Sequence, residues 1–180
     1  MLEIRIHGRG GQGAVVASKI LSDALFREGN VVQAFPIFGV ERRGAPVAAF
    51  LRCDKSPIYL RSEIYHPDML IILDHTLVKN QSVFAGLKEG GLVLINSKNS
   101  PDHYKGNFRF AAVDANAVAV ENGLGSPNAP IVNTAILGAF ARASGICSIE
   151  SIKAAIMDNA PVKPEQNAKA AEDAYVRVRL

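Results

Sequence analysis

The chain has 180 residues, 48% of them hydrophobic and 21% charged, and its formal net charge is only +3. This length suits a single domain over residues 1–180, and the small, scattered charge disfavours a nucleic-acid partner. No apolar run approaches the length of a membrane span, so no membrane partner is expected either. The two cysteines, Cys53 and Cys147, are interpreted as free thiols in a reducing cytoplasm. We therefore expect a cytoplasmic protein.

Apolar runs and helix-period patterns alternate along the chain. The expected strands start with an alternating run at Ile4 and continue at residues 31–35, 47–51, 58–60, 68–74, 92–95 and 107–113. The expected helices cover residues 13–27, 76–88, 115–121, 131–144, 148–159 and 164–178. This alternation predicts an α/β fold with a doubly wound, mostly parallel, Rossmann-like sheet and a helical C-terminal part.

A glycine cluster joins the first strand to the first helix. Gly8, Gly10 and Gly13 fit the pattern G-x-G-x-x-G, and this strand–turn–helix context points backbone N–H groups and the positive end of the helix dipole at one spot. That spot suits an anion, most often a phosphate, and two neighbouring side chains add a positive charge and an amide. The candidate binding residues are Gly8, Arg9, Gly10, Gly11, Gln12 and Gly13.

The second strand lacks the acid that a nicotinamide or flavin site usually places at its end to hold the ribose. Residues 31–36 read Val-Val-Gln-Ala-Phe-Pro, and the first acid after them is Glu41. We therefore interpret the glycine loop as a phosphate or pyrophosphate cradle, and a free dinucleotide-binding regulator is disfavoured.

The loop over residues 36–46 is too apolar for a free surface loop. Its neighbourhood combines four apolar residues with three charged ones, which are Phe35, Ile37, Phe38, Val40, Glu41, Arg42 and Arg43. We interpret this loop as a contact with a partner chain, with the arginines reaching an anion or a carboxylate. The alternative is a loop folded over the core.

The sequence shows no catalytic machinery of its own. It has no Gly-x-Ser-x-Gly elbow, no His-x-x-x-His pair, no Walker A lysine and no thiamine diphosphate motif, and two cysteines cannot supply the ligands of a usual iron–sulfur cluster. His7 and His75 end predicted strands, where ligand crevices form, but a structural hydrogen bond is the favoured role for each. We therefore expect no catalytic residue and no metal ligand in this chain.

Two motifs together carry a family resemblance: Gly8 to Gly13, and the segment Phe38-Gly-Val-Glu-Arg-Arg-Gly-Ala-Pro46. With them the chain resembles the gamma subunit, or gamma domain, of the 2-oxoacid:ferredoxin oxidoreductases, whose familiar members act on pyruvate and ketoisovalerate. The resemblance covers essentially all 180 residues. It includes Asn133 to Ala139, which is similar to the family's Asn-x-x-x-Leu-Gly helix.

The resemblance implies a subunit of a complex that oxidatively decarboxylates a 2-oxoacid, usually to an acyl-coenzyme A, and passes electrons to ferredoxin or another acceptor. Thiamine diphosphate, magnesium and iron–sulfur clusters are expected in partner subunits, which are thiamine-binding and ferredoxin-like. This chain would pack on the thiamine-binding subunits. Coenzyme A would lie at the loop of residues 8–13, with Glu41, Arg42 and Arg43 close to the same interface.

Two roles for the chain stay open at this stage. It either helps to bind coenzyme A or is a purely structural or gating subunit without a ligand of its own. Because substrate contacts are expected mainly in other chains, the sequence does not specify the 2-oxoacid.

Overall fold

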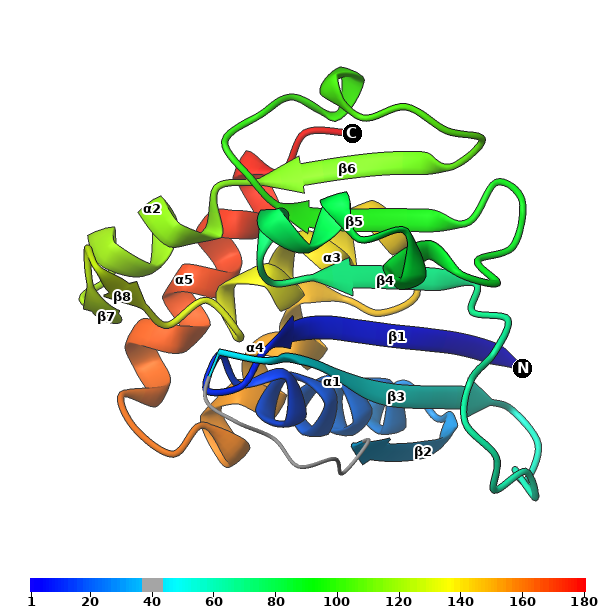
Figure 1. Cartoon of the computed structure of the whole chain (residues 1–180). Coiled ribbons are helices and arrows are strands. Elements are labelled where there is room, and N and C mark those ends of the chain that lie inside the picture. The colour runs from blue at the N-terminus through cyan, green and yellow to red at the C-terminus, as the bar shows by residue number, and fades with distance from the viewer. Residues whose placement is uncertain (37–43) are drawn as a thin grey trace.

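A six-stranded sheet organises the chain in the computed structural model, which describes residues 1–36 and 44–180. The strands lie in the order β2-β3-β1-β4-β5-β6 (Figure 1). Their bounds are Leu2–Arg9 for β1, Val31–Pro36 for β2, Pro46–Asp54 for β3, Met69–Ile72 for β4, Leu92–Asn96 for β5 and Arg109–Val113 for β6. The first strand of the chain is therefore central in the sheet.

Most of the sheet is parallel. β1 runs parallel to β4, β4 to β5 and β5 to β6, whereas β3 is antiparallel to both of its neighbours, β1 and β2. Every residue of β4 and β5 is buried, as expected for parallel strands that are covered on both faces. The predicted α/β class with a mostly parallel, Rossmann-like sheet is confirmed.

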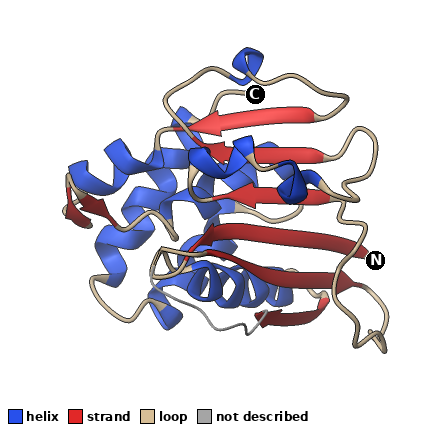
Figure 2. Cartoon of the chain, viewed as in Figure 1, coloured by secondary structure: helices blue, strands red, loops and turns tan. Residues whose placement is uncertain are grey.

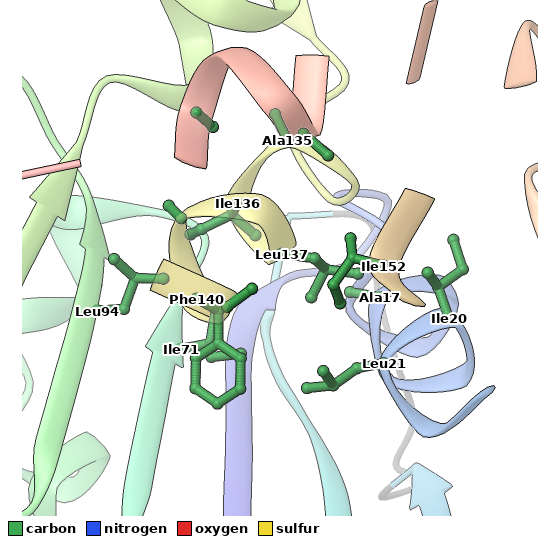
Figure 3. Close-up of a cluster of buried hydrophobic side chains, with 14 of the residues drawn as sticks. Ala17, Ile20, Leu21, Ile71, Leu94, Ala135, Ile136, Leu137, Phe140 and Ile152 are labelled. Carbon is green, nitrogen blue, oxygen red and sulfur yellow. The ribbon is translucent and has the colours of Figure 1, made fainter. Parts of the chain in front are cut away.

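Long α-helices gather on one face of the sheet (Figure 2). The bounds of the α-helices are Ala14–Arg27 for α1, Ala115–Glu121 for α2, Ala135–Ser144 for α3, Ile149–Asn159 for α4 and Pro164–Arg177 for α5. Aliphatic side chains fill the space between these helices and the sheet. Ile71 of β4 and Leu94 of β5 point toward Phe140 of α3, and Ala17 of α1 lies near Ile152 of α4 (Figure 3).

Helices α3 and α5 approach each other closely. A Cβ atom on Gly138 would overlap the backbone of Ala171, so only glycine allows this approach. The buried side of α5 carries small side chains, among them Ala168, Ala170, Ala171 and Ala174. The glycine of the Asn133–Ala139 motif therefore serves helix packing.

The opposite face of the sheet has a smaller apolar cluster under short 3₁₀ helices and loops. Alternate residues of β4 and β5 point to this side and form the cluster with three residues of the covering segments: Leu70, Ile72, Val93, Ile95, Leu77, Val83 and Leu87. The covering helices are η1 (His75–Lys79) and η2 (Gln81–Phe84), and η3 (Pro101–His103) follows β5. The two faces are thus built from different kinds of structure.

The predicted helix over residues 76–88 is wrong in type, because this stretch forms η1 and η2 instead. The Asp74 carboxylate accepts a hydrogen bond from the backbone N–H of Thr76 at 2.9 Å, and the Asn80 side chain accepts one from Ser82 at 3.1 Å. Each of these side chains starts a new short turn and competes with a continuous helix. The helix-like sequence pattern is overridden by these two local caps.

Two buried arginines hold the irregular cover of this face. Arg52 is 1% exposed, and its guanidinium donates to the carbonyl oxygens of Ser62 at 2.8 Å and Glu63 at 3.1 Å. Arg5 is 8% exposed and donates to the carbonyls of Val83 at 2.9 Å and Ala85 at 2.7 Å. These bonds satisfy carbonyl groups that have no place in a regular helix or strand.

Two further expectations need correction. The predicted strand at 58–60 is an irregular segment, and the carbonyl of Leu60 accepts a hydrogen bond from the side chain of Gln33 at 2.9 Å instead of joining a ladder. The first C-terminal helix begins at Ala135 and not at 131, because the preceding chain turns back in a small hairpin of β7 (Gly125–Ser126) and β8 (Ala129–Pro130). The helical C-terminal part itself is confirmed. Within residues 1–36 and 44–180, every helix is too short or too polar to cross a membrane.

Candidate functional site

A cleft of about 880 Å³ opens at the carboxyl ends of the parallel strands. The arrowheads of β1, β4, β5 and β6 point to this edge, where α2 and the β7–β8 hairpin also lie (Figure 1). The cleft is lined by Gly10, Gly11, Gln12, Gly13, Leu73, Asp74, His75, Asn96, Asn116, Asn128, Ala129, Pro130, Ile131, Val132 and Asn133. Open α/β sheets commonly bind ligands at this edge, so most of the predicted glycine loop lies where a site is expected.

The glycine loop has the backbone geometry of a tight turn into α1. Gly11 and Gly13 have φ angles of 95° and 79°, a region that side chains disfavour. A Cβ atom on Gly8 would lie 3.0 Å from the Cδ1 atom of Leu73, which follows β4, so a larger residue would require that side chain to shift. The backbone conformation therefore favours glycine at positions 11 and 13, and close packing favours it at position 8.

The start of α1 offers free hydrogen-bond donors. Gly13 occupies the N-cap position, and α1 has no side-chain cap. The N–H of Ala17 donates to the carbonyl of Gly13 at 2.9 Å, whereas the N–H groups of Ala14, Val15 and Val16 find no acceptor in the part of the chain that the structure describes. Uncapped N–H groups at the positive end of a helix dipole favour an anion.

Gly10 has a structural role within the loop. Its N–H donates to the carbonyl of Ala45 at 2.8 Å, and its carbonyl accepts from the N–H of Gly44 at 3.1 Å. These bonds fasten the loop to the chain that enters β3. The N–H of Gln12 donates to the carbonyl of Arg9 at 2.9 Å, so the donors available to a ligand lie mainly at the start of α1.

Arg9 and Gln12 also hold the loop. The Nε atom of Arg9 lies 2.8 Å from a carboxylate oxygen of Asp74, and the guanidinium also donates to Thr76 at 2.8 Å. The side chain of Gln12 accepts from the N–H of Arg9 at 2.7 Å. Burial raises the pKa of Asp74, but hydrogen bonds from Thr76 and Arg9 outweigh it and keep this pKa below its ordinary value. The positive charge of Arg9, expected to serve the phosphate cradle, is thus paired with the carboxylate of Asp74.

The other half of the predicted site, Glu41, Arg42 and Arg43, lies outside the described residues, as do Ile37, Phe38 and Val40. The proximity of these residues to the glycine loop and to a partner chain stays a prediction. Phe35 lies within β2, where its ring packs on Phe50 with 5.3 Å between centroids. It therefore belongs to the sheet.

Asparagine side chains form a second part of the cleft that sequence reasoning missed. Asn96 ends β5 and donates to the carbonyl of Leu73 at 2.9 Å and to the Asn116 side chain at 3.0 Å. Asn133 is 7% exposed, lies against Gly13, and has an Oδ1 atom that is buried without a partner. The signal in the sequence was that Asn133 opens the third family-like segment.

Neither histidine belongs to an acid–base pair among residues 1–36 and 44–180. His7 faces the side of the sheet that carries Arg5, and burial together with that charge lowers the pKa of His7 to about 4. His75 is exposed at the start of η1, and its neighbour Asp74 is engaged by Arg9. The structural hydrogen bond expected of His7 is not observed, because its Nε2 atom is buried without a partner among the described residues. That neither histidine is catalytic stays a prediction.

The cysteines do not form a reactive site. Both are free and buried, and burial raises the pKa of Cys147 to about 12. The described residues also hold no group of three His, Cys, Asp or Glu side chains that could bind a metal ion.

Comparisons with known proteins identify relatives over the whole chain. Residues 3–176 match the sequence model of the family described as pyruvate ferredoxin/flavodoxin oxidoreductase. The pyruvate/ketoisovalerate oxidoreductases common subunit gamma of Pyrococcus abyssi is 49% identical, over 100% of this chain and 98% of that protein. The pyruvate synthase subunit PorC of Methanocaldococcus jannaschii is 52% identical, over 97% and 96%. The crystal structure of the pyruvate oxidoreductase subunit PORC from Thermotoga maritima superposes with a TM-score of 0.84 at 33% identity, over 99% of this chain and 97% of that one.

Proposed function

Because the chain belongs to the pyruvate ferredoxin/flavodoxin oxidoreductase family, as a gamma-type subunit of a 2-oxoacid oxidoreductase complex, we propose that it binds coenzyme A at the start of α1. In this proposal it packs on the thiamine-binding subunits, with ferredoxin-like subunits in the same complex. Thiamine diphosphate, magnesium and iron–sulfur clusters belong to those partners. Electrons leave the complex for ferredoxin or another acceptor.

One observation carries this proposal: Gly10 to Gly13, which lead into the uncapped start of α1, line a cleft of about 880 Å³. This volume lies within the range of roughly 300–1,000 Å³ that is usual for small-molecule sites. The phosphate groups of coenzyme A suit the free N–H groups of the first turn. The strand that follows α1, β2, ends without an acid for a ribose, which disfavours a nicotinamide cofactor at the same place.

The chain would contribute binding and orientation. The donors of α1 hold the phosphate end of coenzyme A, and Arg9, paired with Asp74, keeps the loop in place. The thiol end is then free to extend toward the thiamine-binding subunit. Holding a reactant in a productive position lowers a barrier by up to about 7–11 kcal/mol in favourable cases, so a subunit without catalytic side chains can strongly affect acyl transfer.

A purely structural or gating role is the second candidate, and an exposed apolar segment favours it. Tyr59 is 83% exposed, Tyr65 is 62% exposed and Leu60 is 47% exposed. The buried guanidinium of Arg52 holds the backbone between them in place through the carbonyls of residues 62 and 63. Exposed apolar side chains on a fixed segment are typical of an interface.

The substitution Val15→Asp separates the two roles. Val15 is 49% exposed in the first turn of α1, where a carboxylate stabilises a helix but repels an anion. We expect the reconstituted complex to bind coenzyme A about tenfold more weakly, from a repulsion of roughly 1–2 kcal/mol, while the melting temperature of the chain is equal or higher.

Val15→Asn is the matched uncharged control and should bind coenzyme A within about twofold of the parent. If both variants assemble and show the parent's coenzyme A affinity, this chain does not hold the phosphate groups. In that case the structural role gains support, and Tyr59→Ser with Tyr65→Ser should reduce co-purification with the other subunits.

A further inference from the structure

We propose that Asn133 is a ligand-binding residue whose side-chain amide joins the start of α1 in holding a phosphate group. The proposal deepens the function given above and rests on it only in placing a phosphate-bearing ligand in the cleft. The comparisons and the sequence assign no role to this asparagine. Its position, orientation and surroundings carry the argument.

The contact between Asn133 and Gly13 places this side chain at the N-terminus of α1. If Gly13 carried a Cβ atom, its nearest neighbour would be the Nδ2 atom of Asn133, with the Cγ atom of the same side chain at 3.0 Å. Glycine is needed at position 13 both for its positive φ of 79° and to admit this amide. The G-x-G-x-x-G motif and the Asn133–Ala139 motif therefore meet in one place.

The orientation of the amide suits a bound anion. The nitrogen of Asn133 is the side-chain atom nearest to the Gly13 N-cap, and both residues line the cleft. The first N–H groups of α1 find no acceptor among residues 1–36 and 44–180. In our proposal a phosphate at this end of the cleft accepts hydrogen bonds from the amide nitrogen and from these N–H groups.

The oxygen of the same amide is evidence that the orientation is not set by internal bonding. Oδ1 of Asn133 is buried and has no hydrogen-bond partner in the described chain. A buried polar atom without a partner calls for an explanation, and a ligand in the adjoining cleft provides one.

The segment that carries Asn133 is held in place from behind. The hydroxyl of Thr134 donates to the side-chain oxygen of Asn167 at 2.6 Å, and both residues are almost fully buried. Asn167 in turn donates to the carbonyls of Val162 at 2.9 Å and Lys163 at 2.8 Å. Because Asn133 directly precedes this anchored residue at the start of α3, its side chain is positioned before any ligand arrives.

The electrostatics of the cleft indicate where the phosphate lies. Asp74 also lines the cleft, but its carboxylate is paired with Arg9 at 2.8 Å. The Gly13 and Asn133 end presents backbone and amide donors. A phosphate monoester or diphosphate therefore binds at this end.

The test is Asn133→Asp, which keeps the shape of the side chain and replaces the donor with a negatively charged acceptor. Inorganic pyrophosphate is titrated into the full chain by calorimetry. We expect at least a tenfold loss of affinity, together with an equal or higher melting temperature, because a carboxylate caps α1. Asn116→Asp adds the same charge elsewhere in the cleft and should reduce affinity only about threefold.

Parent-like pyrophosphate binding by Asn133→Asp would overturn the inference, as would equal losses in both variants or no binding to the parent chain. If Asn133→Asp does not fold, the side-chain amide signal of Asn133 in the parent decides, since it must shift when pyrophosphate is added. Coenzyme A provides the second arm. If the parent binds pyrophosphate, Asn133→Asp weakens that binding and coenzyme A does not bind, only the proposed function is contradicted. If coenzyme A binds equally well to the parent and to Asn133→Asp, only this inference is contradicted.

Discussion

The two faces of the sheet are covered in different ways. On one face α1, α3, α4 and α5 contribute aliphatic side chains and alanines, and packing alone joins most of them to the strands. On the other face, η1, η2 and irregular chain lie over a small apolar cluster. Arg5 and Arg52 of the strands donate hydrogen bonds to backbone carbonyls of this cover.

The difference follows from where backbone hydrogen bonds are made. A helix satisfies its own N–H and C=O groups, so its partner surface needs only apolar side chains of the right shape. An irregular cover leaves carbonyl groups that require donors. Arginine has five N–H donors and no acceptor, which suits it to a strand below several such carbonyls.

Arg52→Met should break the arginine-held face. It leaves the carboxylate of Glu3, now 2.8 Å from the Arg52 Nε atom, without its charge partner, and it leaves the carbonyls of Ser62 and Glu63 without donors. Removing one partner from a buried ion pair costs about 3–5 kcal/mol, so we expect a fall of this size in the free energy of unfolding measured with denaturant.

Adding Glu3→Gln to Arg52→Met removes the uncompensated charge and should recover part of that loss. Limited proteolysis should also show cleavage within residues 55–66 before the rest of the chain is cut. A variant with unchanged stability and no new cleavage site would show that apolar packing holds this face as well.

Gly138→Ala should break the packed face. The added methyl group meets the backbone of Ala171, which cannot rotate away, so α5 must move from α3. We expect a loss of about 3 kcal/mol, at the upper end of usual overpacking effects, together with increased binding of a dye that reports exposed apolar surface.

Gly145→Ala is the comparison variant because it lies at the end of the same helix, with a φ of 67° and no atom within 4 Å of an added Cβ. It should cost about 1–2 kcal/mol by backbone strain without exposing apolar surface. Equal dye binding by the two variants would contradict close helix packing as the reason for Gly138.

The smallest expected effect concerns Glu28, whose hydrogen bonds connect the end of α1 to the start of α4 on the packed face. Its carboxylate accepts from the hydroxyl of Ser151 at 2.7 Å and from the N–H and hydroxyl of Ser148 at 3.0 and 2.8 Å. These bonds, led by the one from Ser151, lower the pKa of Glu28 to about 2. Because the pKa is lower in the folded chain, this stabilisation is complete above the ordinary value of 4.5 and is lost as the pH falls toward about 2.

Glu28→Gln should therefore lower the melting temperature slightly at pH 6 and flatten its decrease between pH 5 and pH 2, as followed by circular dichroism. Glu150→Gln, in the first turn of α4, is the matched control and should keep the parent's decrease. An identical acid profile for all three proteins would contradict the tie between Glu28 and α4.

The sequence was informative wherever the determining contacts are local. The glycine turn, α1 and the three C-terminal helices follow from the spacing of apolar residues and from the residues that begin or end each segment. The buried parallel strands follow from their apolar runs. The prediction of a helix over residues 76–88 was wrong because side-chain caps at Asp74 and Asn80 outweigh the helix-like pattern.

Other features required contacts between distant segments. The sequence gives no sign that Arg52 is buried, because the carbonyls that accept its hydrogen bonds belong to residues 62 and 63. The partner of Arg9 lies at Asp74, and the neighbour of Gly13 is Asn133. Only the fold brings these pairs together, so the sequence located the loop but not the groups that complete it.

The order in which the elements are synthesised has a consequence for folding on the ribosome. β6 ends at Val113, so the sheet is complete before α3, α4 and α5 emerge, and until then α1 is the long helix available for the aliphatic face. The central strand β1 also waits for β4 to complete its parallel pairing. Such long-range pairing is slow, and uncovered apolar surface promotes aggregation. The aliphatic face of the sheet therefore stays largely uncovered until α3, α4 and α5 have emerged.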